Sequence, residues 1–374
     1  MKPNIFKYAT SELSQDAVIC WMLEWANSED KVMKDFSHNF IREMLNSHYN
    51  NFMDKKNLVE VKIKKQYYNI DVLALLCFQD GIVLPLIIED KTYTTEHSDQ
   101  LKRYYESMLK ESKDNEKISE PLGIYYKSGF IYDNEIEKVT KERYGIFNRV
   151  MMINLMKRYI DKVESDIFKN YYDYLRDLEL EEEQIKNILD KDDMQNKSKV
   201  LDTYEGQWIF MKKLFGNCPK GYLYNGSSFG RPWTHCSIVE DFNFKELCDG
   251  IFYRLDRRND GYYLAIRQYL DYSKVNVCKE HLNETDESKI IESKMKRLER
   301  LKKCFERALE NMNLKGIDVL EKGRVSNRGS KESEIGVFFI NEKNTFRKIL
   351  EFIPVFNGMF ESEIEKEFNF ILKI

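Results

Sequence analysis

The first 48 residues carry the spacing of two helices. Leu13, Ala17 and Trp21 recur at intervals of four residues within residues 10–26, behind polar residues suited to capping a helix. We expect this apolar face to pack on the rest of the domain. A second helix is expected over about residues 30–48.

The pattern then changes to the period of two that is typical of strands. Val59, Val61 and Ile63 alternate with charged residues and predict a half-exposed strand. Two more apolar strands are expected at 70–78 and 82–89. Because both faces of these two strands are apolar, we expect them to be central strands covered by helices on both sides.

The remaining elements predict an α/β first domain and an α+β second domain. The first domain continues with a helix at about 97–112, a strand at 121–127 and, after Gly145, one short strand and two helices. The polar segment 190–198 predicts the boundary between domains 1–190 and 199–374. The second domain combines helices at about 203–215, 287–312 and 343–352 with a hairpin of strands 250–255 and 262–270, and we expect it to serve substrate binding, regulation or dimerisation.

Composition narrows the class of protein. The chain has 374 residues, 42% of them hydrophobic, which is enough for a large core and suggests two domains. Its 59 basic and 63 acidic residues argue against binding of nucleic acid by bulk charge alone, although a local basic groove remains an open alternative. No apolar run approaches the roughly 20 residues of a membrane span and the opening residues are polar, so we expect a cytoplasmic protein with no membrane partner. Seven scattered cysteines without a C-x-x-C motif predict reduced thiols rather than disulfides or a zinc site.

The chemistry centres on the hairpin between the two apolar strands. Asp80 and Gly81 form a turn signal, and a three-residue loop centred on Asp80 places Asp71 directly opposite Glu89. Side chains at opposed positions have Cβ atoms roughly 4.5 to 5.5 Å apart. Lys91 shares the face of Glu89, whereas Asp90, the residue between them, points to the opposite face because strand side chains alternate.

Two opposed carboxylates at the end of an apolar hairpin repel each other unless a cation lies between them. Oxygen ligands without cysteine or histidine at ligand spacing suit Mg²⁺ or Mn²⁺. The alternative is a surface hairpin end at which Lys91 forms a solvated salt bridge with Glu89 or Asp90.

Asp71 and the triplet Glu89-Asp90-Lys91 on adjacent strands resemble the PD-(D/E)XK nuclease superfamily, although Ile70 stands in place of the proline of the motif. The following helix carries Gln100 and Tyr104, which resemble the Q-x-x-x-Y motif of the RecB and lambda-exonuclease-like branch. Positions i and i+4 share a helical face. The alternative for Tyr104 is an ordinary core aromatic.

The first helix is also similar to that of bacterial members of this superfamily, in which Glu12 would match a third acidic metal ligand. The resemblance covers about residues 4–160 and implies a restriction-endonuclease-like αβββαβ core. It implies that Asp71 and Glu89 hold the divalent ion and that Asp90 adds its carbonyl oxygen. Lys91 would then position or deprotonate a water molecule, and Gln100 with Tyr104 would orient the nucleic-acid backbone or the lysine.

Several basic residues are candidates for phosphate contacts. Lys62 and Lys64 lie on the strand before Asp71, and Arg103 lies within the Q-x-x-x-Y helix; the alternative is an ordinary solvated surface. A Gly/Ser-containing loop also carries Arg324, Asn327, Arg328 and Lys331. These residues are either contacts for a nucleic-acid backbone or an ordinary solvated surface.

We therefore expect a metal-dependent nuclease, acting on DNA in preference to RNA, with a role in restriction or phage defence implied by resemblance only. A homodimer is one arrangement that the second domain could support. The alternatives are a catalytically inactive nucleic-acid-binding or scaffold protein on a nuclease fold, and an RNA-directed toxin nuclease.

Overall fold

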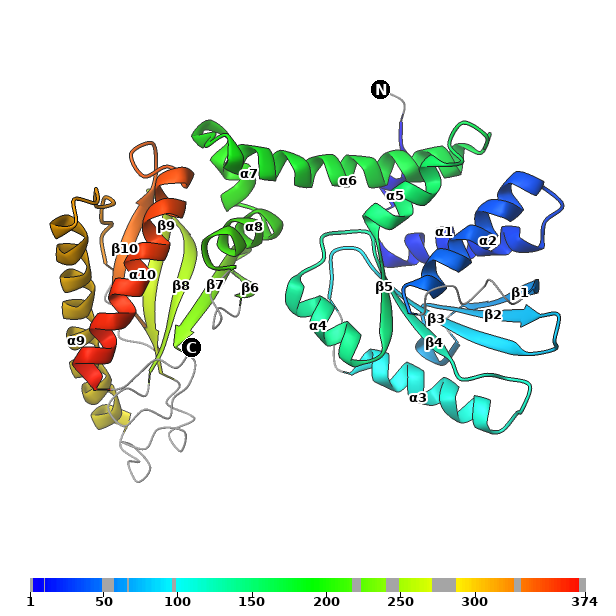
Figure 1. The fold of residues 1–374 in the computed structure, drawn as a ribbon, viewed down its shortest axis with the longest axis horizontal. Helices are drawn as coiled ribbons and strands as arrows, with labels where there is room; N and C mark the ends of the chain where they lie inside the picture. Colours follow the sequence, from blue (N-terminus) through cyan, green and yellow to red (C-terminus); the bar gives the residue numbers. More distant parts are fainter. Residues whose placement is uncertain are drawn as a thin grey trace. The chain divides into compact units, whose positions relative to one another are not determined.

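A computed structural model describes residues 3–9, 11–48, 57–65, 67–95, 99–216, 223–239, 249–270, 287–325 and 331–369. The chain divides into two compact units, Met1–Glu182 and Glu183–Ile374, each with its own sheet (Figure 1). The division falls within helix α6 (Asp166–Asp190), just before the polar segment 190–198. That segment forms the end of α6, a short 3-10 helix (Met194–Asn196) and the start of α7 (Lys197–Leu201).

The sheet of the first unit is mixed, as the restriction-endonuclease-like core implied by the resemblance requires. Its strands lie in sequence order, with β1, β2 and β3 antiparallel and β3, β4 and β5 parallel. Helices α3 and α4 make the crossovers that parallel neighbours require. The strands are β1 (Leu58–Lys65), β2 (Val72–Phe78), β3 (Val83–Lys91), β4 (Leu122–Lys127) and β5 (Tyr144–Asn148), and the crossover helices are α3 (Gln100–Lys113) and α4 (Asp133–Lys141).

The register of the β2–β3 hairpin is the one that the turn signal predicts. Val72 pairs with Ile88 and Cys77 with Val83, so the hairpin is centred on Asp80. Gly81 adopts a φ of 81°, which a residue with a side chain rarely accepts, and the Asp80 carboxylate accepts a hydrogen bond from the Ile82 N–H (3.1 Å). Asp71 directly precedes β2 and therefore lies beside the end of β3.

Helices cover both faces of this sheet (Figure 1). One face of β2 and β3 packs on α1 (Glu12–Glu24), α2 (Lys31–Asn46), α5 (Arg149–Lys157) and the first half of α6. The other face packs on α3 and α4 through Leu101, Tyr104 and Val139. The predicted αβββαβ core with helices on both sides is confirmed.

The face that α1 buries differs from the predicted one. Leu13 is 55% exposed and Ala17 is also exposed, whereas Gln15, Asp16 and Ile19 are buried. The prediction of an apolar face through Leu13 and Ala17 was wrong, because two polar residues share the inward face of the helix.

The second unit has an antiparallel sheet in the order β10-β9-β8-β7-β6. The predicted hairpin is confirmed as β8 (Gly250–Arg258) and β9 (Gly261–Tyr269) with a two-residue turn. The sequence analysis did not predict β6 (Leu223–Ser228), β7 (Arg231–Val239) or β10 (Glu332–Ile340), nor α4 in the first unit. The helices are α7, α8 (Tyr204–Phe215), α9 (Glu287–Leu314) and α10 (Phe346–Phe368), and α10 continues well beyond the expected end at 352, across Pro354.

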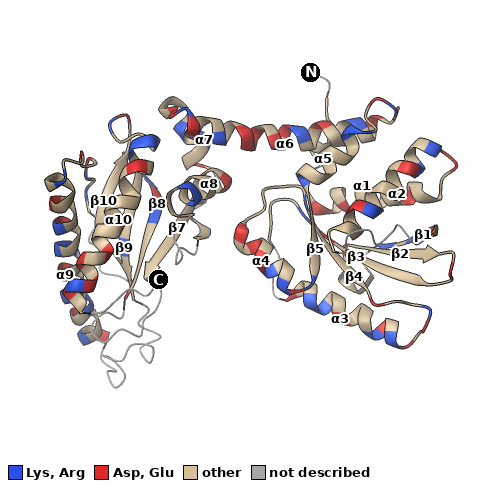
Figure 2. Ribbon diagram, in the orientation of Figure 1, with Lys and Arg blue, Asp and Glu red and all other residues tan. Residues whose placement is uncertain are grey.

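The two faces of the second sheet differ in character. One face packs on α8, α9 and α10 through aromatic contacts, including Phe215–Tyr253 (4.8 Å between ring centroids) and Phe305–Phe338 (5.5 Å). The other face carries charged residues along β8 and β9, some of which are visible in Figure 2. None of the described helices combines the length and the apolar character needed to cross a bilayer.

A buried ion pair joins α9 to the start of β8. The Arg297 guanidinium donates to both carboxylate oxygens of Asp249 (2.7 and 3.1 Å), and the Gln268 side-chain amide donates to the same carboxylate (2.9 Å). Both charged side chains are almost fully buried. Removing one partner would leave a buried charge without compensation.

We expect Asp249→Ala to lower the free energy of unfolding by about 3–5 kcal/mol, as is typical when one partner of a buried pair is removed. Urea denaturation checks this value. The control is Glu292→Ala on the same helix, which breaks an exposed pair with Lys296. The exposed pair should contribute less than about 1 kcal/mol, and equal losses in the two variants would contradict the prediction.

Candidate active site

Three carboxylates converge on one lysine at the end of the β2–β3 hairpin. Lys91 Nζ lies 2.5 Å from Glu89 Oε1, 3.6 Å from Asp71 Oδ2 and 3.7 Å from Glu12 Oε2. The same ammonium donates to the carbonyl oxygen of Asp90 (3.0 Å). The structure therefore brings together the four charged side chains that the sequence indicated.

Local structure explains how each of these groups reaches the cluster. Glu89 and Lys91 share a face of β3 because strand side chains alternate. Asp71, which precedes β2, accepts a hydrogen bond from the Asp90 N–H (3.2 Å). Glu12 begins α1 and accepts a hydrogen bond from the Thr94 hydroxyl.

Burial controls the electrostatics of the cluster. Glu89 is fully buried, and burial raises the pKa of its carboxyl to about 8; the charge of Asp71 acts in the same direction and that of Lys91 opposes both. Burial alone would lower the pKa of the Lys91 ammonium, but the charges of Glu89, Asp71 and Glu12 outweigh it and hold that pKa above its ordinary value. The second Glu89 oxygen, Oε2, is buried and has no hydrogen-bond partner in the described part of the chain.

Asp90 takes part only through its main chain. Its side chain points to the opposite face of β3, as the alternation predicts, where it accepts a hydrogen bond from the Gln15 side chain of α1. Burial raises the pKa of the Asp90 carboxyl well above its ordinary value. Only the N–H and the carbonyl oxygen of this residue contact the cluster.

The inward face of α1 contributes residues that the sequence analysis missed. Asp16 is buried beside the cluster, and burial followed by the charge of Asp71 raises the pKa of its carboxyl to about 6. Gln15 contacts Asp90 and lies 3.4 Å from the Thr92 hydroxyl. Glu12, Gln15 and Asp16 have the i, i+3, i+4 spacing of one helical face, which is the signal that could have revealed them.

A second buried lysine, Lys127, is linked to Glu12 through Thr94. Lys127 of β4 donates to Glu135 of α4 (2.9 Å) and to the carbonyl oxygen of Thr94. The hydroxyl of Thr94 is the group that donates to Glu12. Nothing in the pattern of the sequence predicted this chain of contacts, because α4 itself was not predicted.

Gln100 and Tyr104 contact each other across one turn of α3. The Gln100 side-chain amide donates to the Tyr104 hydroxyl (2.7 Å). Burial raises the pKa of Tyr104, and the charges of Glu89 and Asp71 are close enough to add to this effect. The Tyr104 ring also packs in the core beneath α3, so the residue is a core aromatic with its hydroxyl directed to Gln100.

The basic residues proposed as phosphate contacts lie outside the cluster. Lys62 pairs with Glu60 (3.2 Å) on the exposed side of β1, and Lys64 lies over the ring of Tyr67 (4.1 Å). Arg103 is exposed on α3. None of the three contacts Lys91 or its carboxylates in the described part of the chain.

The donor atoms of the cluster have the chemistry of a magnesium or manganese site. Carboxylate and carbonyl oxygens are the ligands that these ions prefer, and the unpartnered Oε2 of Glu89 is a buried acceptor that a cation would satisfy. Among the described residues, no three Asp, Glu, His or Cys side chains are arranged around a common point for an ion. In this structure the carboxylates gather around Lys91 instead.

We expect Lys91→Met to lower the free energy of unfolding at pH 9, above the pKa of Glu89, by about 3 kcal/mol or more, because it leaves the buried Glu89 carboxylate without its cation. The double variant Glu89→Gln/Lys91→Met should recover part of this loss, since both charges are then removed. The control is Lys141→Met, which breaks an exposed pair with Glu137 on α4. A Lys91→Met variant no less stable than this control would show that the cluster is not a coupled buried pair.

Comparison with known families gives one match. A family model described as the PD-(D/E)XK nuclease superfamily matches residues 3–214, which is more than half of the chain and includes every residue of the cluster. No curated protein and no solved structure matches the chain.

Proposed function

The chain belongs to the PD-(D/E)XK nuclease superfamily, and we propose that its first unit is a metal-dependent nuclease that hydrolyses phosphodiester bonds. One observation carries this proposal: Glu12, Asp71 and Glu89 converge on the ammonium of Lys91 at the end of a buried hairpin. Gathering four charged groups, of which Glu89 and Lys91 are buried, is unfavourable for stability. The arrangement is understandable if the charges serve catalysis.

The proposed roles follow from the chemistry of each side chain. Asp71, Glu89 and Glu12 would hold Mg²⁺ or Mn²⁺, with the carbonyl oxygen of Asp90 as a further ligand. The ion would lower the pKa of a bound water and neutralise charge on the scissile phosphate. Lys91 would orient the water and offset the negative charge that develops on the phosphate in the transition state.

The groups around the cluster would position these residues or the substrate. Gln100 and Tyr104 would orient the nucleic-acid backbone or Lys91, and their side chains are already held together by a hydrogen bond. The exposed residues Lys62 and Arg103 and the half-buried Lys64 remain candidates for contacts with phosphates farther along the strand.

We propose DNA as the substrate, because the Gln100 and Tyr104 pair resembles the motif of the RecB and lambda-exonuclease-like branch. A role in restriction or phage defence would follow the same resemblance. Incubation of the protein with plasmid DNA, linear DNA and RNA tests the substrate class directly. Cleavage of RNA alone would favour an RNA-directed nuclease.

We expect Glu89→Gln and Lys91→Met each to reduce the cleavage rate at least about 100-fold, since each removes a group that acts on the scissile phosphate. Asp90→Asn should be much milder, because the Asp90 side chain points away from the cluster. Gel assays of DNA cleavage measure the rates, and Glu137→Gln on the exposed face of α4 is the control. Wild-type rates in the Glu89 and Lys91 variants would refute the catalytic assignment.

We expect Mg²⁺ or Mn²⁺ to support cleavage and EDTA to abolish it, while Ca²⁺ binds but supports cleavage poorly because its oxygen shell is larger and looser. Mg²⁺ or Mn²⁺ should also raise Tm, since an ion concentration of 100 times the dissociation constant stabilises the folded state by about 2.7 kcal/mol. Glu89→Gln should lose this shift. Equal cleavage in EDTA and in Mg²⁺ would contradict the proposed dependence on a metal.

A further inference from the structure

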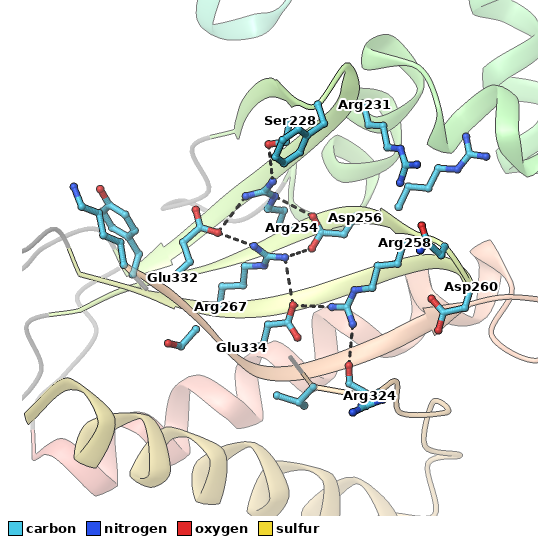
Figure 3. A pocket seen from close by; sticks show the side chains of 17 residues that line it. Ser228, Arg231, Arg254, Asp256, Arg258, Asp260, Arg267, Arg324, Glu332 and Glu334 are labelled. Atoms are coloured by element: carbon cyan, nitrogen blue, oxygen red, sulfur yellow. Dashed lines mark hydrogen bonds and ion pairs between the residues drawn. The ribbon is translucent and has the colours of Figure 1, made fainter. Parts of the chain in front are cut away.

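The helix-free face of the second sheet carries an open cavity of about 1130 Å³ (Figure 3). Seven of its lining residues are Arg or Lys and four are Asp or Glu, a cationic surplus in a chain whose net charge is −4. We call this surface the arginine face. Its volume exceeds the roughly 300–1,000 Å³ of ordinary small-ligand pockets, which favours an extended ligand.

The floor of the arginine face is a network of ion pairs with equal numbers of arginines and carboxylates (Figure 3). Arg254 contacts Asp256 (3.0 Å) and Glu332 (3.2 Å), and Arg267 also contacts Glu332 (2.6 Å). Glu334 accepts hydrogen bonds from Arg267 (3.3 Å) and from Arg258 (2.7 Å). Three arginines are therefore paired with three carboxylates. This ion-pair network holds its side chains in place and contributes no net positive charge to the arginine face.

The surplus comes from the rim. Arg231 and Arg324 are exposed and have no carboxylate partner among the described residues. Arg257 forms an ion pair with Asp202 (2.8 Å). Asp260 is the only acidic residue of the described lining that lies outside the ion-pair network. Because the floor carries no net charge, the positive charge of the arginines at the rim is available to bind an anionic ligand.

The turn between β6 and β7 adds an aromatic group to this rim. Ser228 pairs with Arg231, and the two residues between them, Phe229 and Gly230, have φ values of 53° and 73°. Positive φ at both positions is typical of a type I′ turn, in which Asn is favoured before Gly and a bulky residue is not. Phe229 is also fully exposed, with a relative accessibility of 105%. Neither backbone preference nor burial explains an aromatic ring at this position, two residues before Arg231. The exposed ring is suited to stacking on a ligand.

We propose that the arginine face binds a single strand of nucleic acid, with phosphates on Arg231 and Arg324 and with one base stacked on Phe229. A positively charged surface that carries an exposed aromatic ring is the arrangement by which proteins bind unpaired strands, because bases that are not paired can stack on side chains. The choice of nucleic acid over other polyanions rests on the function proposed for the first unit. Binding itself requires neither metal nor cleavage.

Fluorescence anisotropy of a fluorescein-labelled oligothymidylate with the full-length chain in EDTA tests this proposal. Phe229→Asn should weaken binding roughly ten-fold, while Tm holds or rises because Asn suits the turn. Phe229→Trp should keep the affinity. The matched control is Leu314→Ala, which removes another exposed apolar side chain of the same unit.

The salt dependence of the same binding tests the arginines. Arg231→Gln and Arg324→Gln should each reduce the slope of log K against log salt by about 0.7, the value for one phosphate contact on a single strand. Lys296→Gln on the exposed face of α9 changes the charge equally and should leave the slope unchanged.

Three outcomes would overturn the proposal: unchanged affinity in Phe229→Asn, equally tight binding of duplex DNA, or equal competition by polyglutamate. Failure of the nuclease proposal would look different. In that case the wild type would bind the strand in EDTA but would not cleave it with Mg²⁺.

Discussion

The register of the β2–β3 hairpin is the constraint on which the candidate site depends. Pairing of Val72 with Ile88 places Asp71 beside the end of β3, where Glu89 and Lys91 share a face. A shift of one residue would turn Glu89 and Lys91 to the opposite face and bring the Asp90 side chain in their place. The apolar side chains on both faces of β2 and β3 pack on helices, so such a shift would also disturb both cores. Hydrophobic packing therefore fixes the position of charged groups that would not associate stably on their own.

The same constraint explains the composition of α1. This helix lies against the end of the hairpin and contributes both core residues, such as Ile19 and Met22, and polar residues, such as Gln15 and Asp16, from one inward face. Buried polar groups need partners, and Gln15 finds one in Asp90. Asp16 Oδ1 and Glu89 Oε2 have no partner among the described residues, and this concentration of unsatisfied acceptors distinguishes the region from an ordinary salt bridge.

Sequence reasoning succeeded where the information is local. The Asp-Gly turn and the strand alternation were enough to predict the hairpin, its register and the convergence of Asp71, Glu89 and Lys91. The prediction of the buried face of α1 was wrong because Gln15 and Asp16 interrupt the apolar stripe. The exposed Leu13 and Ala17 therefore looked like part of that stripe. Strand β7 was missed because it begins with Arg-Pro and carries a polar face. Its strand character comes from pairing with β6 and β8, which no local pattern reveals.

The second sheet shows why charge must be considered by location rather than as a total. Its charged face arises from partners on different strands, since Arg254, Arg267 and Glu332 come from β8, β9 and β10 and meet only in the folded sheet. The net charge of −4 argued against binding of nucleic acid by bulk charge alone and left open a local basic surface. Carboxylates outnumber the lysine at the end of the β2–β3 hairpin, whereas cations outnumber carboxylates around the arginine face. These two local balances have opposite signs, so a chain that is acidic overall can present one cluster suited to cations and another suited to phosphates.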